Sequence, residues 1–139
     1  MKKTTHLIKP LHLNIKGNET GSLIALEENK DIPFNIKRVY YIFGTSDGTS
    51  RGYHAHKKLS QAAVCIKGSC QFVLDDGINK EKVLLNTPHT GLFIDPLIWH
   101  EMHDFSPDCI LLVFADDYYD ESDYIRDYDQ FKKYTTKNS

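Results

Sequence analysis

Residues 51–68 read Arg-Gly-Tyr-His-Ala-His-Lys-Lys-Leu-Ser-Gln-Ala-Ala-Val-Cys-Ile-Lys-Gly, and the fold prediction depends mainly on them. His54 and His56 are two positions apart, so on a β-strand both side chains point to the same face. Two imidazoles on one face can share a metal ion or pass a proton, because each titrates near pH ~6.5 unless it is perturbed. An exposed strand with two incidental histidines has the same spacing, so the rest of the chain must distinguish these interpretations.

The stretch resembles the first motif of the cupin family, in which two histidines and a glutamate hold a metal ion inside a small β-barrel. Gln61 stands at the glutamate position, and Gly68 follows it by seven residues. Further along the chain, Gly91, Pro96 and His100 match the second cupin motif. We therefore expect an all-β fold, a cupin jelly-roll barrel with a short C-terminal helix. A neutral Gln61 binds divalent metals poorly, so the site is expected to serve acid–base chemistry, with no metal and no cofactor.

The composition predicts a single domain over residues 1–139. A typical domain holds ~100–150 residues, and a chain of this size can bury a core without disulfides. The net charge is −2 and the charges are dispersed, so nothing favours binding to nucleic acid or to an anionic membrane. An anionic ligand must then be held by a local cluster of arginine and lysine. The amino terminus lacks the apolar core of a signal peptide and no stretch approaches the ~18 apolar residues of a membrane span, so we expect a cytoplasmic protein.

The three cysteines, Cys65, Cys70 and Cys109, are odd in number, widely spaced and embedded in apolar runs. We interpret them as buried reduced thiols rather than as a disulfide framework. This interpretation agrees with a cytoplasmic location, where thiols stay reduced.

Short strands separated by turns run through residues 6–115 and are typical of an all-β barrel. Residues 6–15 contain Pro10 and are predicted as an edge strand, because proline cannot donate to a central ladder. Residues 16–21 and 28–33 are predicted as a turn and a polar loop. Besides the histidine strand, we expect strands at 22–27, 36–43, 62–66, 71–74, 81–85, 92–94, 99–105 and 109–115, with hairpins around 67–69 and 75–77.

Residues 36–43, Ile-Lys-Arg-Val-Tyr-Tyr-Ile-Phe, form the clearest predicted strand, since they are rich in β-branched and aromatic residues. The alternation places Arg38 and Tyr40 on one face. An arginine in the middle of such a strand is unusual unless it meets a carboxylate or a phosphate. A surface arginine on a half-exposed sheet is the alternative interpretation.

The residues after 115 change in character and carry a series of aromatic side chains. Several of them, including Tyr124 and Phe131, have helical spacing, and Asp120 or Ser122 is a suitable cap. We therefore predict a helical tail at about 120–135 whose aromatic side chains pack against the barrel.

Four stretches of the chain resemble the dTDP-4-keto-6-deoxyglucose 3,4-ketoisomerases, a group of WxcM-like sugar isomerases. They are Lys-Arg-Val-Tyr-Tyr at 37–41, Arg-Gly-Tyr-His-Ala-His-Lys-Lys at 51–58, Trp-His-Glu-Met-His-Asp-Phe at 99–105 and Asp-Tyr-Tyr-Asp-Glu-Ser-Asp-Tyr-Ile-Arg at 117–126. The resemblance covers residues 21–134 and implies an isomerase that moves a ketone from C4 to C3 of dTDP-4-keto-6-deoxyglucose without a redox cofactor. The product would feed the synthesis of 3-amino-3,6-dideoxyhexoses for surface glycans such as O-antigen, lipopolysaccharide and S-layer glycan.

This reaction suggests a role for each polar residue of the motifs. His54 and His56 are expected to supply the base and the proton relay, and Tyr40 to donate to the developing enolate oxygen. Arg38 and Arg51 are expected to bind the diphosphate, because a guanidinium group offers two parallel donors. The further substrate-binding residues that we predict are His100, Gln61, Lys58 and Glu101.

The resemblance also carries three finer expectations. The family often has an arginine before Gly21 that contributes to phosphate binding, and Thr20 stands there instead, so that contact is lost or supplied by another residue such as Lys16. The Trp-His-Glu-Met-His form of residues 99–103 resembles enzymes that make the galacto product, and His100 is expected to influence which face is protonated at C4. Members of the family form homodimers through exchanged N-terminal strands, which we expect here as well.

Other classes of function stay open. A cupin dTDP-sugar 3,5-epimerase would use the same barrel but would exchange protons at C3 and C5. A metal-dependent cupin, such as a dioxygenase, would need His54, His56 and His100 to hold iron or another divalent ion; three neutral imidazoles weaken this reading without forbidding it. A non-catalytic sugar-binding module is the least specific alternative.

Overall fold

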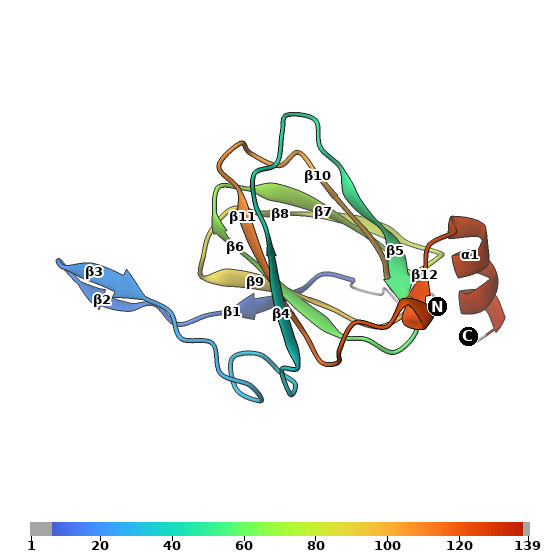
Figure 1. The fold of residues 1–139 in the computed structure, drawn as a ribbon, viewed down its shortest axis with the longest axis horizontal. Helices are drawn as coiled ribbons and strands as arrows, with labels where there is room; N and C mark the ends of the chain where they lie inside the picture. Colours follow the sequence, from blue (N-terminus) through green and yellow to red (C-terminus); the bar gives the residue numbers. More distant parts are fainter. Residues whose placement is uncertain (1–6, 138–139) are drawn as a thin grey trace, which may run out of the picture.

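The computed structural model describes residues 7–137 and consists of two five-stranded antiparallel β-sheets that face each other (Figure 1). The first sheet contains, in spatial order, β1 (Lys9–His12), β9 (Thr90–Ile94), β6 (Gln61–Lys67), β11 (Ile110–Ala115) and β4 (Arg38–Ile42). The second sheet contains β12 (Tyr124–Ile125), β5 (Arg51–His56), β10 (Trp99–His103), β7 (Cys70–Asp75) and β8 (Lys80–Leu85). Most neighbouring strands are distant in the sequence, as in a jelly roll, and the predicted all-β cupin barrel is confirmed.

The hydrophobic core lies between the two sheets. Phe72 of β7 and Leu111 of β11 meet there and are at most 1% exposed. Each side chain of this kind contributes about 1.5–3 kcal/mol when it is fully buried. A second cluster covers the outer face of the first sheet, where Ile32 from a loop packs on Ala62 and Phe114. The central strands of the first sheet are therefore apolar on both faces.

The turn at residues 67–69 does not close the hairpin that we predicted. β6 pairs with β9 and β11, whereas β7 pairs with β10 and β8, so the turn carries the chain from one sheet to the other. Gly68 has a φ of +72°, and a Cβ there would lie 2.2 Å from Ser106 Oγ, so the crossing requires glycine. The second predicted hairpin, around 75–77, is confirmed, because β7 and β8 pair across it.

The expected edge strand at 6–15 is shorter in the structure. β1 pairs only with β9 and lies at the edge of the first sheet. Pro10 fits there because an edge strand has one side without ladder hydrogen bonds. Residue 6 lies outside the described residues.

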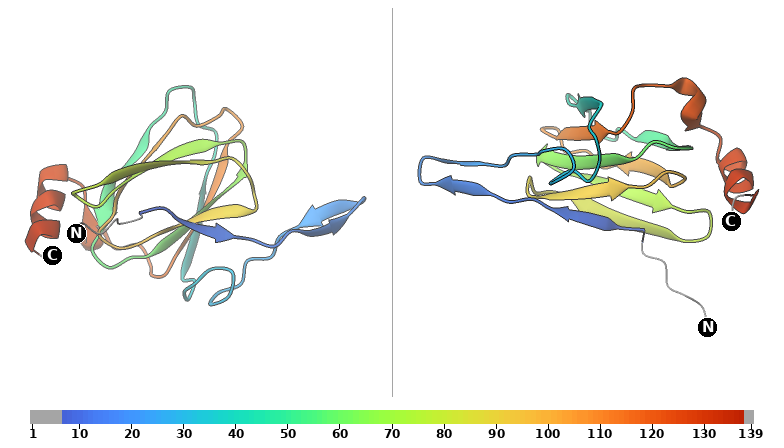
Figure 2. Two further views of the ribbon diagram at one scale, coloured as in Figure 1. Left: turned by 180° about the vertical axis from the view of Figure 1, so that it is seen from behind. Right: turned by 90° about the horizontal axis from the view of Figure 1, so that it is seen from below.

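The predicted turn at 16–21 and the predicted strand at 22–27 are only partly confirmed, because the turn is confined to residues 19–20 and the strand ends at residue 23. β2 (Lys16–Asn18) and β3 (Gly21–Leu23) pair as a hairpin that projects from the barrel (Figure 2). A Cβ at Gly17 would lie 2.4 Å from the carbonyl oxygen of Gly21. The glycine that suggested a turn instead allows two strands to approach closely.

The C-terminal tail is only partly helical. A 3₁₀ turn, η1 (Glu121–Asp123), has Asp120 as its cap and is followed by β12. The α-helix, α1 (Tyr128–Lys137), begins only after that strand. The predicted helix at 120–135 is therefore wrong in its first half, because Tyr124 of β12 pairs with β5 instead.

α1 packs on the outer face of the second sheet. Phe131 is fully buried against Trp99 of β10, with ring centroids 5.7 Å apart, and the Tyr128 hydroxyl donates to Asp75 at 2.7 Å. The helical part of the aromatic series thus packs against the barrel as predicted. Within residues 7–137, no helix is long and apolar enough to cross a membrane.

Candidate active site

Three histidines from two neighbouring strands meet inside the barrel. His54 and His56 project from β5, and His100 lies opposite His54 on β10. One ring nitrogen from each histidine lies within 4.8 Å of the other two, and the ring centroids of His54 and His100 are 4.6 Å apart. His56 and His100 are each 3% exposed, whereas His54 is partly exposed, so the cluster faces the outside through His54.

Gly52 permits the close approach of β5 and β10 that brings the imidazoles together. It has a φ of +91°, and a Cβ there would lie 2.9 Å from the carbonyl oxygen of His100. The pairing of the two strands shifts between His100 and Glu101, which marks a β-bulge. A side chain at position 52 would strain the backbone and push the strands apart, so the glycine before the His-x-His pair has a positioning role.

Backbone carbonyl groups determine the tautomers of two imidazoles. His54 Nδ1 lies 3.0 Å from the oxygen of Gly52, and His100 Nδ1 lies 3.1 Å from the oxygen of Ile98. A carbonyl oxygen can only accept, so each Nδ1 carries the hydrogen and donates it. Nε2 of each ring is then unprotonated and can take a proton from a substrate.

Burial keeps the three imidazoles uncharged. Desolvation lowers the pKa of His54, lowers that of His100 to about 3 and lowers that of His56 to about 2. The neighbouring imidazoles and arginines lower the pKa of His56 further. At neutral pH the cluster is therefore a set of neutral bases.

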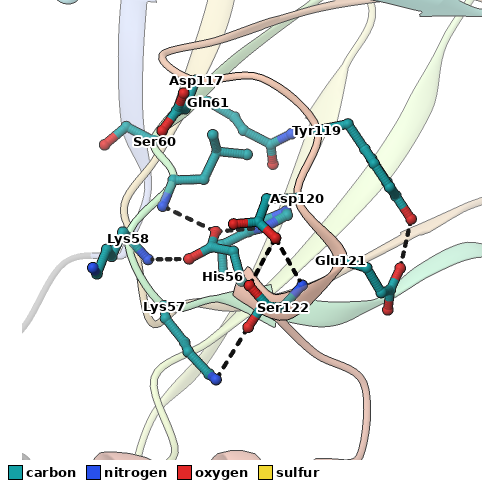
Figure 3. Close-up of polar contacts among 12 residues, drawn as sticks. His56, Lys57, Lys58, Ser60, Gln61, Asp117, Tyr119, Asp120, Glu121 and Ser122 are labelled. Atoms are coloured by element: carbon teal, nitrogen blue, oxygen red, sulfur yellow. Dashed lines mark hydrogen bonds and ion pairs between the residues drawn. The ribbon is translucent and has the colours of Figure 1, made fainter.

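Asp123 of η1 is held behind His56. Its carboxylate accepts hydrogen bonds from the backbone N–H groups of Lys58 at 2.9 Å and Leu59 at 3.3 Å, and it lies 3.3 Å from Nδ1 of His56. Figure 3 shows η1 folded against the connection between β5 and β6. Within residues 7–137 neither ring nitrogen of His56 has an aligned hydrogen bond, so the carboxylate is placed to pair with the ring once a proton arrives.

Tyr40 of β4 reaches the same interior and is held by Gln61. The amide Nε2 of Gln61 donates to the Tyr40 hydroxyl oxygen at 3.0 Å, and Gln61 is 2% exposed. Burial raises the pKa of Tyr40, so the phenol stays protonated. Because its oxygen accepts from Gln61, its own hydrogen is directed to another acceptor. Gln61 therefore orients an acid rather than ligating an ion.

A cavity of about 550 Å³ opens beside His54. Its lining includes Tyr40 and three arginines, Arg38, Arg51 and Arg126. Nε of Arg38 is buried and has no hydrogen-bond partner in the described part of the chain. Several guanidinium groups around one cavity favour an anionic ligand such as a diphosphate.

A smaller cavity of about 240 Å³ lies on the side of His56. Arg38 and Tyr124 line both cavities, while His56, Lys58 and Asp123 line only the smaller one. The two histidines of β5 therefore border different cavities, although their ring centroids are only 4.9 Å apart.

The structure brings most of the predicted site residues together. Arg38, Tyr40, Arg51 and His54 line the larger cavity, and Lys58 lines the smaller one. The buried residues behind them are His56, His100 and Gln61.

Glu101 is not brought to this cavity. It lies on the opposite face of β10 from His100, where one carboxylate oxygen accepts from Trp99 Nε1 at 2.9 Å. The other oxygen lies 2.9 Å from Nε2 of His103, whose Nδ1 pairs with Ser50 at 2.9 Å. Glu101, which we predicted as a substrate-binding residue, thus lines neither cavity.

The C-terminal segment also contributes to the larger cavity through Tyr119, Tyr124 and Arg126, none of which was predicted as a site residue. Tyr124 was assigned to a packing helix because of its spacing, yet its ring centroid lies 4.4 Å from that of His56. Arg126 stacks on Tyr124, with Cζ 4.2 Å from the ring centroid, and pairs with Glu121 at 2.7 and 2.9 Å. Residues 117–126, in which tyrosines are interspersed with charged residues, were the part of the sequence that could have indicated these site residues.

The jelly-roll barrel and the histidines of β5 and β10 define the protein as a cupin, and its imidazoles are arranged as neutral bases beside a cationic cavity. More specifically, the chain belongs to the family described as WxcM-like, C-terminal, whose FdtA model matches residues 6–136. The resemblance predicted from the motifs is thereby confirmed.

Several characterised proteins are similar to this chain. The TDP-4-oxo-6-deoxy-alpha-D-glucose-3,4-oxoisomerase of Aneurinibacillus thermoaerophilus is 61% identical over 117 residues, which is 84% of each chain. A 3,4-ketoisomerase from Helicobacter canadensis is 49% identical with a TM-score of 0.90, over 93% of this chain and 97% of that one. The sugar 3,4-ketoisomerase QdtA from Thermoanaerobacterium thermosaccharolyticum, solved with TDP, is 41% identical with a TM-score of 0.93, over 97% and 98% of the two chains. A variant of QdtA was solved with TDP-4-keto-6-deoxyglucose.

Proposed function

We propose that the chain is a 3,4-ketoisomerase that converts TDP-4-keto-6-deoxyglucose to a TDP-3-keto-6-deoxyhexose. The observation that carries this proposal is the contact of His54 Nδ1 with the Gly52 carbonyl oxygen, which leaves Nε2 to act as a base, in a residue that lines an arginine-rich cavity together with Tyr40. A neutral base beside a phenol suits the movement of a proton next to a ketone. The identity of 61% to a TDP-4-oxo-6-deoxy-alpha-D-glucose-3,4-oxoisomerase supports the same substrate.

The reaction moves hydrogen within the sugar and needs no other reagent. His54 takes the proton from C3, and the electrons of that C–H bond form an enediolate with negative charge on the C4 oxygen. Tyr40 donates a hydrogen bond to that oxygen, which stabilises the charge. The C4 oxygen is then protonated, the C3 hydroxyl gives up its proton, and a proton is added to C4, so the ketone is left at C3.

His56 and Asp123 are proposed to stabilise the proton while it is held by the protein. An imidazolium in a buried cluster is costly unless a negative charge lies close to it. The Asp123 carboxylate, 3.3 Å from His56 Nδ1, is the anion nearest to that ring in the observed contacts. His56 also lines the smaller cavity, which offers a route for exchange with solvent.

Arg38, Arg51 and Arg126 are proposed to bind the diphosphate. Their guanidinium groups line the larger cavity, and Arg38 Nε is buried without a partner in residues 7–137, which a phosphate oxygen would satisfy. Lys58 lies on the smaller cavity and is proposed to add long-range attraction for the anion.

The configuration of the product at C4 is proposed to be galacto, with His100 as the group that influences protonation at that carbon. His100 presents an unprotonated Nε2, and its ring centroid lies 4.6 Å from that of His54. NMR of the first product formed distinguishes the two epimers. A gluco product at early times would contradict this assignment.

The ligand set of a metal-dependent cupin is incomplete here. The three imidazoles are close enough to share an ion, but the anionic fourth position of the cupin motif is Gln61, whose amide is used to orient Tyr40. We therefore assign no step to a metal. Activity is expected to survive prolonged chelation; loss on chelation with restoration by a divalent ion would favour the metal-dependent alternative.

We also propose that the chain forms a homodimer. Apolar side chains are unusually exposed on the outer face of the first sheet, including Val39 at 51%, Tyr41 at 61% and Phe43 at 68%. The projecting β2–β3 hairpin carries Leu23, which is 58% exposed, and a second copy would cover both surfaces. Sedimentation showing a monomer at micromolar concentration would contradict this proposal.

The enzyme is proposed to act in the cytoplasm and to supply a 3-keto sugar nucleotide for 3-amino-3,6-dideoxyhexoses of surface glycans. Its three free buried cysteines suit a reducing compartment. A keto group at C3 is the functional group that a 3-aminotransferase would convert to an amine.

One experiment tests the central proposal. The protein is incubated with TDP-4-keto-6-deoxyglucose, the product is trapped by a 3-aminotransferase, and it is identified by NMR. His54→Asn should lower turnover by ~10²-fold or more, because asparagine cannot accept a proton at neutral pH. His89→Asn is the matched control, since His89 is an exposed loop residue. Full activity of His54→Asn would remove the assigned base, and deuterium at C5 in heavy water would indicate an epimerase.

A further inference from the structure

The three cysteines, which are distant in the sequence, meet at one place in the fold. Cys65 lies in β6, Cys70 begins β7, and Cys109 directly precedes β11. Their sulfur atoms all lie within 4.8 Å of one another, and the sulfurs of Cys65 and Cys109 are 3.6 Å apart. All three residues are at most 1% exposed. We name this group the thiol cluster.

The thiol cluster lies away from the histidines, toward the opposite end of β6. Gln61, which contacts Tyr40, begins β6, and Cys65 is four residues further along, or ~13 Å at the usual rise of a strand. On β7, Cys70 is at the opposite end from Asp75, which contacts α1. The cluster and the candidate active site are therefore separate sites in the same barrel.

Two turns are packed closely to bring the sulfurs together. Gly68 has a φ of +72°, and a Cβ there would lie 2.9 Å from Cα of Cys109, so a larger residue would push the turns apart. Ser69 N donates to Ser106 Oγ at 2.9 Å, and Ser106 N donates to the carbonyl oxygen of Ser69 at 2.9 Å. These contacts hold the segment before β11 against the β6–β7 turn.

The sulfur atoms have the spacing and chemistry of a metal site. An ion bound to three sulfurs in a plane, with bonds of ~2.3 Å, holds those sulfurs ~4 Å apart. The observed separations, 3.6 Å for one pair and no more than 4.8 Å for the others, require only small side-chain rotations to reach that value. Thiolates are soft ligands and select soft ions such as Cu(I), Zn(II) or Cd(II) over hard ones.

All three thiols are buried, so a thiolate formed here is not stabilised by solvent. A buried thiolate without a counterion is costly, and a cation at the centre of the sulfurs would remove that cost.

We propose that the thiol cluster is a binding site for a soft, thiophilic metal ion. Each thiol that becomes a ligand releases its proton to solvent, and no electron is transferred. The donor set consists of three sulfurs, so ions that accept three sulfur ligands fit it better than zinc, which prefers four. Cys65 and Cys109 adjoin the first sheet and Cys70 belongs to the second, so the bound ion would tie the two sheets together at this end of the barrel.

Cadmium is the probe for this proposal, because a sulfur-to-cadmium charge-transfer band in the ultraviolet cannot arise from histidine. The reduced protein should show the band with a stoichiometry of one ion per chain. The variants Cys65→Ala, Cys70→Ala and Cys109→Ala should each bind cadmium ~100-fold or more weakly, since even outer-shell partners of a metal are worth ~10–100-fold. His54→Asn is the matched control for binding at the imidazoles, and it should keep the band.

A rise in the thermal midpoint with cadmium, present in the parent protein and absent in the cysteine variants, is the second expected result. This comparison of thermal midpoints uses only variants whose circular dichroism spectrum matches that of the parent protein. Competition with Zn(II) and with Cu(I) under reducing conditions then ranks the ions, and Cu(I) is expected to bind more tightly. Absence of the band when all three thiols are free, or its persistence after loss of each cysteine in turn, would overturn the proposal.

Discussion

His56 Nδ1 lies 3.3 Å from Asp123 Oδ2, and the carboxylate is held there by the backbone N–H groups of Lys58 and Leu59. A carboxylate beside one ring nitrogen of an imidazole raises the affinity of that imidazole for a proton, without any contact between the carboxylate and the substrate. Asp123 belongs to η1, which follows the last strand of the first sheet by several residues. The C-terminal tail thus places a carboxylate beside an imidazole of the histidine strand.

Asp123→Asn should lower kcat by ~10–100-fold with little change in KM, the scale expected for an outer-shell partner of a reacting group. The amide oxygen can still accept from Lys58 N, but it carries no charge to support a protonated His56. The acid limb of the pH–rate profile should move to lower pH, because loss of the Asp123 carboxylate charge lowers the pKa of His56.

Asp117→Asn is the control for this variant, since Asp117 lines the same smaller cavity and its carboxylate accepts only from the neighbouring Tyr118 N in the observed contacts. Unchanged kcat and an unchanged pH profile in Asp123→Asn would show that the carboxylate has only a structural role.

The stability of the protein should fall as the pH drops below ~6.5, the usual pKa of an unfolded histidine. Burial lowers the pKa of His100 to about 3 and that of His56 to about 2 in the folded state, so between these values and ~6.5 the unfolded chain binds more protons. Each group contributes a slope of at most ~1.4 kcal/mol per pH unit. Urea unfolding at pH values from 4 to 8 measures the free energy of unfolding. Intervals of ~0.5 pH unit between measurements are sufficient to define the slope.

His100→Asn provides the comparison for that titration, because it removes one of the groups that must be charged on unfolding. Its stability should depend less steeply on pH below ~6.5 than that of the parent. Equal slopes in the two proteins would mean that other groups dominate the acid destabilisation.

Gln61→Glu should lower kcat by ~10²-fold, the scale of a lost electrostatic donor. The parent amide donates to the Tyr40 oxygen and leaves the phenol hydrogen for the substrate, whereas a carboxylate would accept that hydrogen instead. Tyr40→Phe should cause a loss of similar size. In the double variant the two losses should not add, because both act through the same hydroxyl. Full additivity of the two effects would mean that Gln61 acts independently of Tyr40.

Phe131→Ala should lower the free energy of unfolding by about 3–5 kcal/mol, the usual cost of removing a buried phenylalanine. Phe131 is 0% exposed and packs α1 onto Trp99 and Ile125. Urea unfolding gives the value, and kcat measured well below the melting temperature should stay near that of the parent, since Phe131 lines neither cavity. Lys133→Ala, at an exposed position of the same helix, is expected to have little effect.

The central part of the fold and most of the site could be predicted from the sequence. Period-two alternation determines which side chains share a face, and this placed Arg38 beside Tyr40 and His54 beside His56. The same alternation separates His100 from Glu101 across β10, which places the Glu101 side chain away from the larger cavity.

The remaining features depend on pairing between distant segments, which local patterns do not report. Tyr124 has helical spacing to its neighbours, yet it joins a strand because β5 offers an open edge. The turn at 67–69 has the composition of a hairpin, and only the partners of β6 and β7 reveal that it connects two sheets. Spacing along the chain likewise gives no indication that the sulfur atoms of Cys65 and Cys109 lie 3.6 Å apart.

The position of β12 after all the other strands has a consequence for biosynthesis. A nascent chain that extends to Ala115 contains every strand of the two sheets except β12, and its barrel can already bury the main core. It lacks Asp123, Tyr124 and Arg126, which border the two cavities. The strands of the barrel are therefore synthesised before its ligand site is complete, and a molecule clipped after Ala115 would lack the residues that close both cavities.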